Sequence, residues 1–275
     1  MDILLVILIV GILGLLALCW VWPSVQEGFA TATDAAAAWS TTPADKKARA
    51  DHTCTVLRSM EDTEANAEGL SGVRIEIVAP TCEAGLPHTS DANTIRLTEE
   101  SWSRRSAAER AATLRHERAH IRQRRDPEAW RTFYAKAWSY TLSETPPPHL
   151  PAEILEGVRG NPDTAHSQTP WACWQGRYWF VPLYADPHQP RLPDARTPVW
   201  DARDQILLDE PPEAWRAFFC GGGTCPYQRE HPHEIAAEIW TALGSQGSRN
   251  ESPRASTPAA LALLGADSPL SPQVR

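Results

Sequence analysis

The residues of this chain with the clearest chemistry lie in the pentapeptide His116-Glu117-Arg118-Ala119-His120. Residues four apart on a helix share one face, so a helix here would place the two imidazoles one turn apart, where both can bind one metal ion. Glu117 would then lie beside a metal-bound water and accept its proton. The chemistry indicated is hydrolysis by a metal-activated water, provided that the segment is helical.

The flanking residues predict that helix over residues 107–125. Ser106 and Glu109 have the spacing of a capping box, in which each side chain bonds to the backbone N–H of the other residue. Strong helix formers follow without glycine or proline, and Pro127 ends the run. Both imidazoles are therefore expected on one side of a single helix.

A catalytic zinc site also needs a third protein ligand and an open position for water. The segment 230–240 is a second predicted helix, with Pro232 near its start, and it carries Glu234 and Glu238 one turn apart. These two helical motifs resemble the gluzincin class of zinc metallopeptidases. The resemblance implies that Glu234 is the third ligand and that Glu238 hydrogen-bonds a ligand histidine, which would set its tautomer.

The resemblance further implies an α+β, zincin-like domain that hydrolyses a protein or peptide substrate. Zn²⁺ held by both histidines and Glu234 would polarise the peptide carbonyl, while Glu117 passes the proton of water to the leaving amine. Tyr227 and His231 lie close to the third ligand in sequence and are the candidate donors to the developing oxyanion.

The chain departs from the family at Arg118 and Arg122, where such helices usually carry uncharged residues, and at Glu238, where aspartate is more frequent. A solvated basic helix with two incidental histidines is one alternative. The rival function is a membrane-tethered binding or scaffold protein with an incidental or inactive motif. A zinc hydrolase acting on a non-peptide amide is a third possibility.

Other residues remain possible ligands. Asp163 lies in the turn-forming segment 159–164, where such a residue more often closes an Asx turn or caps a helix. His231 and His233 flank Pro232, and His88 precedes a short predicted strand. Isolated histidines are more often surface or core residues than ligands. Glu238 also remains open as a ligand.

The N-terminal segment is a predicted membrane anchor, residues 1–23. Residues 3–22 carry no charge, and at about 1.5 Å per residue such a helix spans about 30 Å, the thickness of the hydrocarbon core. Trp20 and Trp22 lie at one end, as interfacial aromatic residues do. A cleaved signal peptide fits less well, because the segment has no basic region before it and no small-x-small cleavage site. We expect a single-pass membrane protein.

The remaining chain divides by composition. Residues 24–68 are rich in alanine and charge and predict a helical stalk, residues 69–244 form the expected catalytic domain, and residues 245–275 read as a disordered tail. The net charge of −8 argues against a nucleic-acid partner, which would require a basic surface.

Within the domain, strands are predicted at 73–77 and 94–97, and the family resemblance implies that a sheet edge aligns the substrate. A helix with an aromatic stripe is predicted over 128–142, and strands at 177–181 and 205–208. The last two belong to an insertion, residues 171–208, that is expected to form one side of the substrate cleft.

Six cysteines are present, without a C-x-x-C pair, so a structural zinc knuckle is not expected. Cys220 and Cys225 are spaced to close a tight loop by a disulfide, which would require an exported domain.

Overall fold

The computed structural model describes residues 33–34, 42–165, 170–220 and 225–244. The chain divides into two units between Thr33 and Asp34, which together form the short strand β1 (Thr33–Asp34). The predicted anchor, the stalk residues 24–32 and 35–41, and the predicted tail lie outside the described residues. Of the helices in the described ranges, none is long and apolar enough to cross a bilayer.

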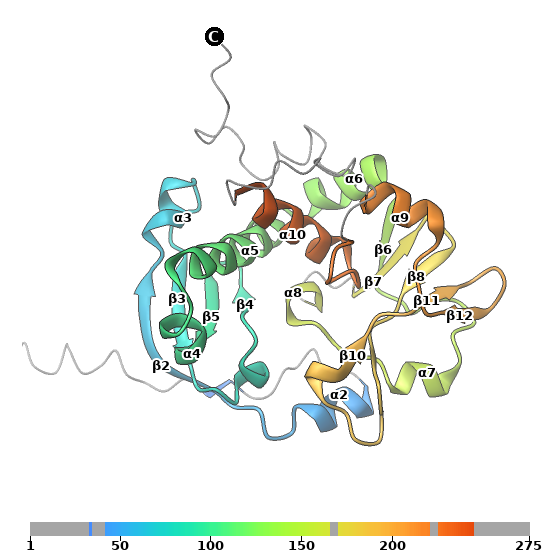
Figure 1. Ribbon diagram of the computed structural model, residues 1–275, viewed down its shortest axis with the longest axis horizontal. Coiled ribbons are helices and arrows are strands. Elements are labelled where there is room, and N and C mark those ends of the chain that lie inside the picture. Colours follow the sequence, from blue (N-terminus) through green and yellow to red (C-terminus); the bar gives the residue numbers. More distant parts are fainter. Residues whose placement is uncertain (1–32, 35–41, 166–169, 221–224, 245–275) are drawn as a thin grey trace, which may run out of the picture. The chain divides into compact units, whose positions relative to one another are not determined.

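The larger unit is a mixed α/β structure whose first sheet has the strand order β2-β3-β5-β4 (Figure 1). Its strands are β2 (Cys54–Glu61), β3 (Arg74–Val78), β5 (Thr94–Thr98) and β4 (His88–Asp91). β3 and β5 are parallel, whereas β2 and β4 pair antiparallel with their neighbours. The two strands predicted at 73–77 and 94–97 are confirmed to within one residue.

The predicted helical stalk is wrong for residues 54–61, because they form β2 and pair along β3. Only two short helices flank this strand, α2 (Pro43–Ala48) and α3 (Thr63–Ala67). A disulfide joins Cys54 at the start of β2 to Cys82 in the short 3₁₀ helix η1 (Cys82–Gly85). The alanine-rich composition of residues 24–68 concealed this strand, whose stability comes from pairing with β3, between Val56 and Val78 at one end and Glu61 and Arg74 at the other.

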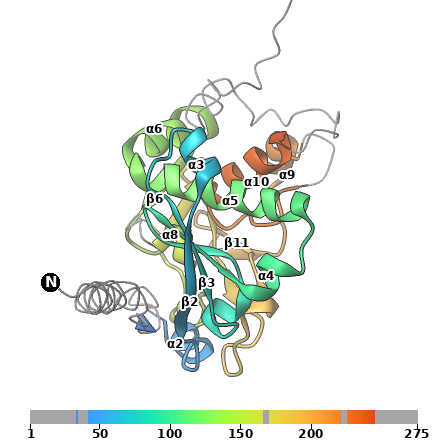
Figure 2. The same cartoon turned by 90° about the vertical axis from the view of Figure 1, so that its left-hand side faces the viewer.

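The helix α5 (Ala107–Arg125) crosses this sheet, as Figure 2 shows, and follows the short α4 (Glu99–Ser103). The predicted capping box is confirmed, since the Ser106 side chain and the Glu109 side chain each accept the other residue's backbone N–H. Leu114 and Ile121 of α5 pack on the sheet residues Ile75, Ile77, Ile95 and Leu97. Another side of α5 packs against α10 (Pro232–Gly244), so the two predicted motif helices are neighbours.

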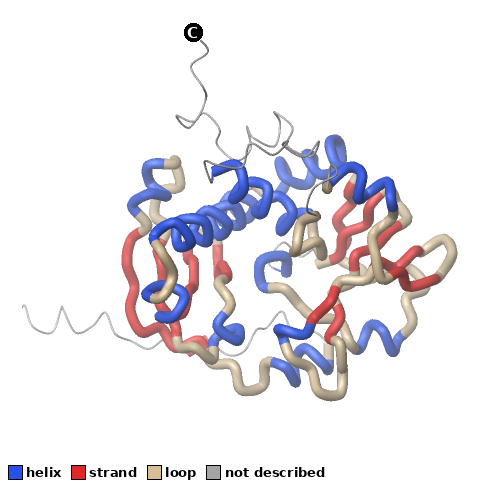
Figure 3. Tube along the Cα trace, in the orientation of Figure 1, coloured by secondary structure: helices blue, strands red, loops and turns tan. Residues whose placement is uncertain are grey.

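A second group of strands, red on the right of Figure 3, forms an antiparallel sheet in the order β12-β11-β8-β7-β6. Its strands are β6 (Tyr140–Ser143), β7 (Trp171–Trp174), β8 (Tyr178–Phe180), β11 (Val199–Asp201) and β12 (Ile206–Leu208). A two-stranded ribbon pairs β9 (Leu183–Tyr184) with β10 (Ala195–Arg196), next to the 3₁₀ helix η2 (Leu192–Asp194). The remaining helices are α6 (Pro127–Trp138), α7 (Ala152–Glu156), α8 (Pro162–Ala165) and α9 (Glu213–Phe219).

The helix predicted over 128–142 is correct only as far as Trp138. Ser139 takes a left-handed conformation, φ 59°, which ends the helix, and the next residues form β6 beside β7. The aromatic stripe is core, as predicted: Trp130 and Phe133 are buried in the cluster that includes Ile235 of α10. The strands predicted at 177–181 and 205–208 are confirmed within this second sheet.

The Cys54–Cys82 disulfide gives a testable stability prediction. Its two cysteines are 28 residues apart, and closing a loop of that length restricts the unfolded chain by about 3–4 kcal/mol in the chain-entropy account. We expect Cys54→Ala/Cys82→Ala to lose about that much unfolding free energy in urea titrations. The Cys220–Cys225 pair spans only 5 residues, so Cys220→Ala/Cys225→Ala should lose only about 2 kcal/mol. The reverse order would contradict the loop-length explanation.

Candidate metal centre

The three residues predicted as metal ligands come together where α5 meets α10. His116 Nε2 lies 3.1 Å from His120 Nε2, and the Glu234 Oε2 atom lies 3.2 Å from the first and 3.3 Å from the second. His120 and Glu234 are fully buried, whereas the His116 side chain is 18% exposed. The three atoms form a nearly equilateral triangle, and of these residues His116 lines an open pocket.

This triangle has the dimensions of a tetrahedral zinc site. Zinc bonds of ~2.0–2.1 Å in a tetrahedron separate the ligand atoms by about 3.3–3.4 Å. The observed separations of 3.1–3.3 Å are close to that value. Two imidazoles and one carboxylate are also a donor set that zinc accepts, with the fourth position left for water. The residues present therefore fit a zinc ion.

Gln123 sets the tautomer of His120. The Gln123 amide nitrogen donates to the His233 carbonyl oxygen at 2.9 Å and to the Tyr134 hydroxyl at 3.2 Å, so its oxygen faces the other way. That oxygen accepts from His120 Nδ1 at 2.8 Å, which places a proton on Nδ1. In the neutral ring, Nε2 then presents a lone pair toward Glu234, and a cation between them relieves the repulsion.

The charges around His120 favour a positive charge on or beside its ring. Burial lowers its pKa, but the negative charges of Glu234 and Asp163 outweigh burial and raise the pKa to about 10. A divalent cation at Nε2 would supply the positive charge that these carboxylates favour.

Asn161 orients Glu234 in the same manner. Its side-chain oxygen accepts the backbone N–H of Asp163 at 2.8 Å, and its amide nitrogen donates to Glu234 Oε1 at 2.8 Å. The Oε2 atom is thereby left for the triangle. Neither Gln123 nor Asn161 was predicted as part of the site; the spacing of Gln123 three residues after His120 was a usable signal, whereas Asn161 had none.

Glu117 lies at the pocket without a partner for one of its oxygens. The side chain is 3% exposed, and its Oε2 atom is buried with no hydrogen-bond partner among the described residues. Burial, together with the charge of Asp163, raises the pKa of its carboxyl group. An unsatisfied buried carboxylate calls for a donor, and a water molecule in the adjacent pocket is one that this position admits.

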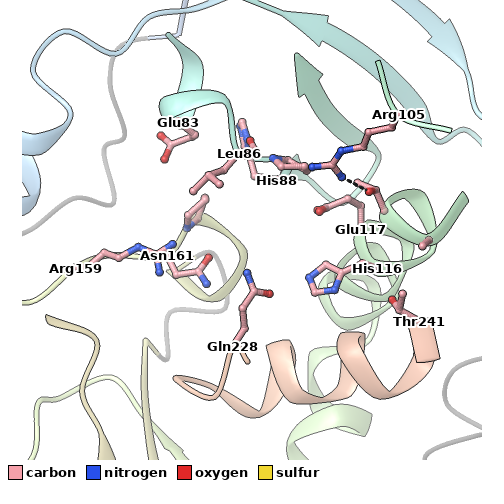
Figure 4. A pocket seen from close by; sticks show the side chains of 14 residues that line it. Glu83, Leu86, His88, Arg105, His116, Glu117, Arg159, Asn161, Gln228 and Thr241 are labelled. Carbon is pink, nitrogen blue, oxygen red and sulfur yellow. Dashed lines mark hydrogen bonds between the residues drawn. The ribbon is translucent and has the colours of Figure 1, made fainter. Parts of the chain in front are cut away.

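The pocket has a volume of about 310 Å³ and is seen from close by in Figure 4. His116 and Glu117 lie on one side of it, and Asn161 and Arg159 lie on the other. Glu83, Leu86, Pro87, His88 and Gln228 also line it. The insertion 171–208 was expected to form a side of this cleft, but its strands belong to the second sheet and the two-stranded ribbon, and none of its residues lines the pocket.

Asp163, the main alternative ligand, is held mostly by other groups. Its Oδ1 atom accepts the backbone N–H of Thr89 at 2.8 Å and the Thr89 hydroxyl, and it lies 3.5 Å from the Arg124 guanidinium. Asp163 is still near enough to form a second group with Glu117 and His120, with ligand atoms within 4.8 Å of one another. Because Oδ1 of Asp163 already accepts these hydrogen bonds from Thr89, Glu234 is the better third ligand. The bond to Thr89 also occupies an outward N–H of the edge strand β4, so a substrate strand cannot pair with β4 at that residue.

Three sequence expectations for this region are corrected by the structure. Glu238 accepts the backbone N–H groups of Tyr227 and Gln228, at 2.9 and 2.7 Å, so it holds a loop and orients no histidine. The Tyr227 side chain is 90% exposed, and His231 is buried at a different cavity, with its Nδ1 accepting the His233 N–H at 3.2 Å. Neither predicted oxyanion donor lines the pocket, because the turn before Pro232 directs His231 back onto its own helix.

The remaining histidine alternatives also have other partners. The His233 ring bonds to the Tyr134 hydroxyl at 2.9 Å, and burial lowers its pKa. His88 lines the pocket, but its Nδ1 lies 3.1 Å from the Leu86 carbonyl oxygen and burial lowers its pKa to about 4. Both rings are buried, and neither belongs to the group formed by His116, His120 and Glu234.

The two unusual arginines of the motif helix face away from the metal centre. Arg118, 2% exposed, pairs with Asp62, Glu64 and Glu68 around α3, and Arg122 also reaches Glu68. The helix is thus packed between a sheet and α10, and the alternative of a solvated basic helix is wrong. The arginines join α5 to the α3 region without entering the site.

The role of Gln123 is testable by metal affinity. Gln123→Leu removes the acceptor for His120 Nδ1, and loss of such a partner generally weakens metal binding about 10–100-fold. We expect that loss in zinc competition with a chromophoric chelator. Gln123→Glu keeps an acceptor and should retain most of the affinity, while the exposed Gln189→Leu serves as control. Equal zinc affinities for all three variants would show that Gln123 does not contribute to metal binding.

Glu117 lies close to the histidine–glutamate triangle, with a ligand atom within 4.8 Å of one of His120, and this triangle is the feature from which a function can be argued. Comparison of this chain with protein-family models, with curated proteins and with solved structures finds no match.

Proposed function

We propose that this protein is a zinc-dependent metallopeptidase of gluzincin-like type. The observation that carries the proposal is the triangle of His116, His120 and Glu234 atoms with the spacing of a tetrahedral zinc site. The tautomer that Gln123 imposes on His120 supports the same conclusion. The rival reading, an incidental motif in a scaffold protein, offers no reason for a buried acid and two imidazoles to converge.

The chemistry that zinc supplies when bound is Lewis acidity, which lowers the pKa of a water and polarises a carbonyl. His116, His120 and Glu234 would hold the ion, and Gln123 and Asn161 keep two of these ligands in orientation. Glu117 accepts a proton from the attacking water through its free Oε2 atom and delivers it to the leaving amine.

We also propose a peptide bond as the scissile group and a membrane location for the chain. The pocket opens to solvent beside Glu117 and is large enough for one or two residues of an extended peptide. A non-peptide amide would use the same residues, and a panel of peptides and small amides separates the two cases. The uncharged residues 3–22 are the support for a single-pass anchor.

Metal analysis of the purified full chain tests the proposal. We expect about one zinc per chain, lost in the His116→Ala/His120→Ala double variant, because two of three ligands are removed. The matched control is His149→Ala/His188→Ala, which removes two exposed histidines outside the triangle. A native chain free of zinc after incubation with the ion, or zinc that survives the first double change, would refute the proposed site.

A further inference from the structure

Two arginines line the pocket beside the metal centre. Arg105 is exposed, and its Nη1 donates to the Thr113 hydroxyl at 2.6 Å, the dashed line of Figure 4. Arg159 lies on the opposite side of the pocket, with its side chain 16% exposed. A substrate entering the pocket therefore passes guanidinium groups on both sides.

Arg105 has a weak charge partner in Glu109, whose pKa is lowered first by hydrogen bonds from Ser106 and then by the charge of Arg105. Glu83 is paired with the buried Arg49, and Arg159 is 3.4 Å from the buried Glu230. Across the ranges that the structure describes, no carboxylate forms an ion pair with Arg105. Its single side-chain bond is to a neutral hydroxyl, which leaves the other guanidinium donors free for a ligand.

The position of Arg105 relates it to the scissile bond. Thr113, which holds it, lies three residues before His116 and on the same face of α5, about 5–6 Å away between Cβ atoms. An extended peptide advances about 3.3 Å per residue. A group bound by Arg105 would therefore belong to a residue one or two positions from the bond being cleaved.

From this geometry we propose that the substrate presents a carboxylate to Arg105, next to the scissile bond. This inference rests on the proposed function, and it adds the substrate class. A guanidinium binds a carboxylate through two parallel hydrogen bonds, and Arg159 adds positive charge from the far side. The carboxylate can come from an acidic side chain or from the free C-terminus of a peptide; both have the same chemistry at Arg105.

Peptide binding is measured with the zinc-loaded Glu117→Gln full chain, because this variant should bind the peptides without cleaving them. The probes are fluorescent degenerate pools of hexapeptides: neutral with a C-terminal amide, the same with one fixed Glu, Gln or Lys, and neutral with a free C-terminus. We expect one of the two carboxylate pools to bind about tenfold more tightly than the neutral pool, since a charged hydrogen bond is worth about that factor. The pool that does so identifies the source of the carboxylate.

Arg105→Gln should abolish this preference. Arg104→Gln is the matched control, because it removes the same charge one residue away, where the side chain is 76% exposed and pairs with Glu100. Thr113→Val should weaken the preference without abolishing it, since it only releases Arg105. Equal binding of all pools, or a preference that survives Arg105→Gln, would overturn the inference.

Cleavage by the native chain distinguishes this failure from failure of the proposed function. If neutral and carboxylate pools are cleaved at equal rates, the protein is a peptidase but has no preference for a carboxylate. If carboxylate pools bind selectively and no pool is cleaved, Arg105 binds a carboxylate but the protein is not a peptidase.

Discussion

Glu117→Gln is expected to lower the rate of peptide hydrolysis by about 10²–10⁴-fold, the usual contribution of a positioned general base. Glutamine has nearly the same shape but cannot accept the proton of the attacking water. In the variant, the free Oε2 position would be occupied by the amide nitrogen or the carbonyl oxygen of glutamine. The substitution removes no ligand of the triangle. Zinc content should therefore stay at about one ion per chain.

The measurement is kcat and KM on the preferred peptide pool, together with metal analysis of the same sample. Glu128→Gln, at an exposed position on α6, is the control and should leave both parameters unchanged. Undiminished turnover in Glu117→Gln would exclude Glu117 as the base. Loss of zinc would instead show that Glu117 helps to bind the metal, which is possible because its ligand atom lies near those of His120 and Asp163.

The second large effect is expected for stability. Asp62→Ala should reduce the unfolding free energy by about 3–5 kcal/mol, because it leaves the buried Arg118 guanidinium without its main partner. Asp62 accepts from Arg118 Nε at 2.8 Å and from Nη2 at 2.6 Å, and both residues are at most 3% exposed. The same carboxylate caps α3 through the Ala65 N–H.

Urea unfolding of Asp62→Ala and of Glu64→Ala compares the loss of a buried partner of Arg118 with the loss of an exposed one. Glu64 also reaches Arg118, at 3.1 Å, but its side chain is 69% exposed, so its loss should have an effect of about 0–1 kcal/mol. The double change Asp62→Leu/Arg118→Leu removes both charges and should recover part of the lost stability. Similar losses for Asp62→Ala and Glu64→Ala would show that the buried pair does not stabilise this fold.

The local parts of this structure were predictable because short-range interactions determine them. The capping box at Ser106 and the break at Pro127 bound α5, and the spacing of four residues puts both histidines on one face. The alternating residues of β3 likewise place their apolar side chains on the buried side of a sheet. Each of these features depends on residues within about one turn or one strand of one another.

The structural predictions were wrong where contact with a distant segment of the chain determines the local structure. Residues 54–61 form a strand because β3 pairs with them, and Tyr140 leaves the predicted helix because β7 pairs with β6. Glu238 binds the loop at Gln228 because that loop folds back over α10. Propensity is weak at such positions, and pairing with a distant strand or loop outweighs it.

The sequence by itself determined which residues can do chemistry and on which helices they lie. Only the tertiary structure decided that Glu234, 118 residues after His116, meets the histidines, and that Gln123 and Asn161 hold the ligands in orientation. It also brought Arg105 to the pocket that Glu117 faces. The physical reason is that helix spacing follows from local backbone hydrogen bonds, whereas the convergence of α5, α8 and α10 follows from the burial of apolar faces that lie far apart in the chain.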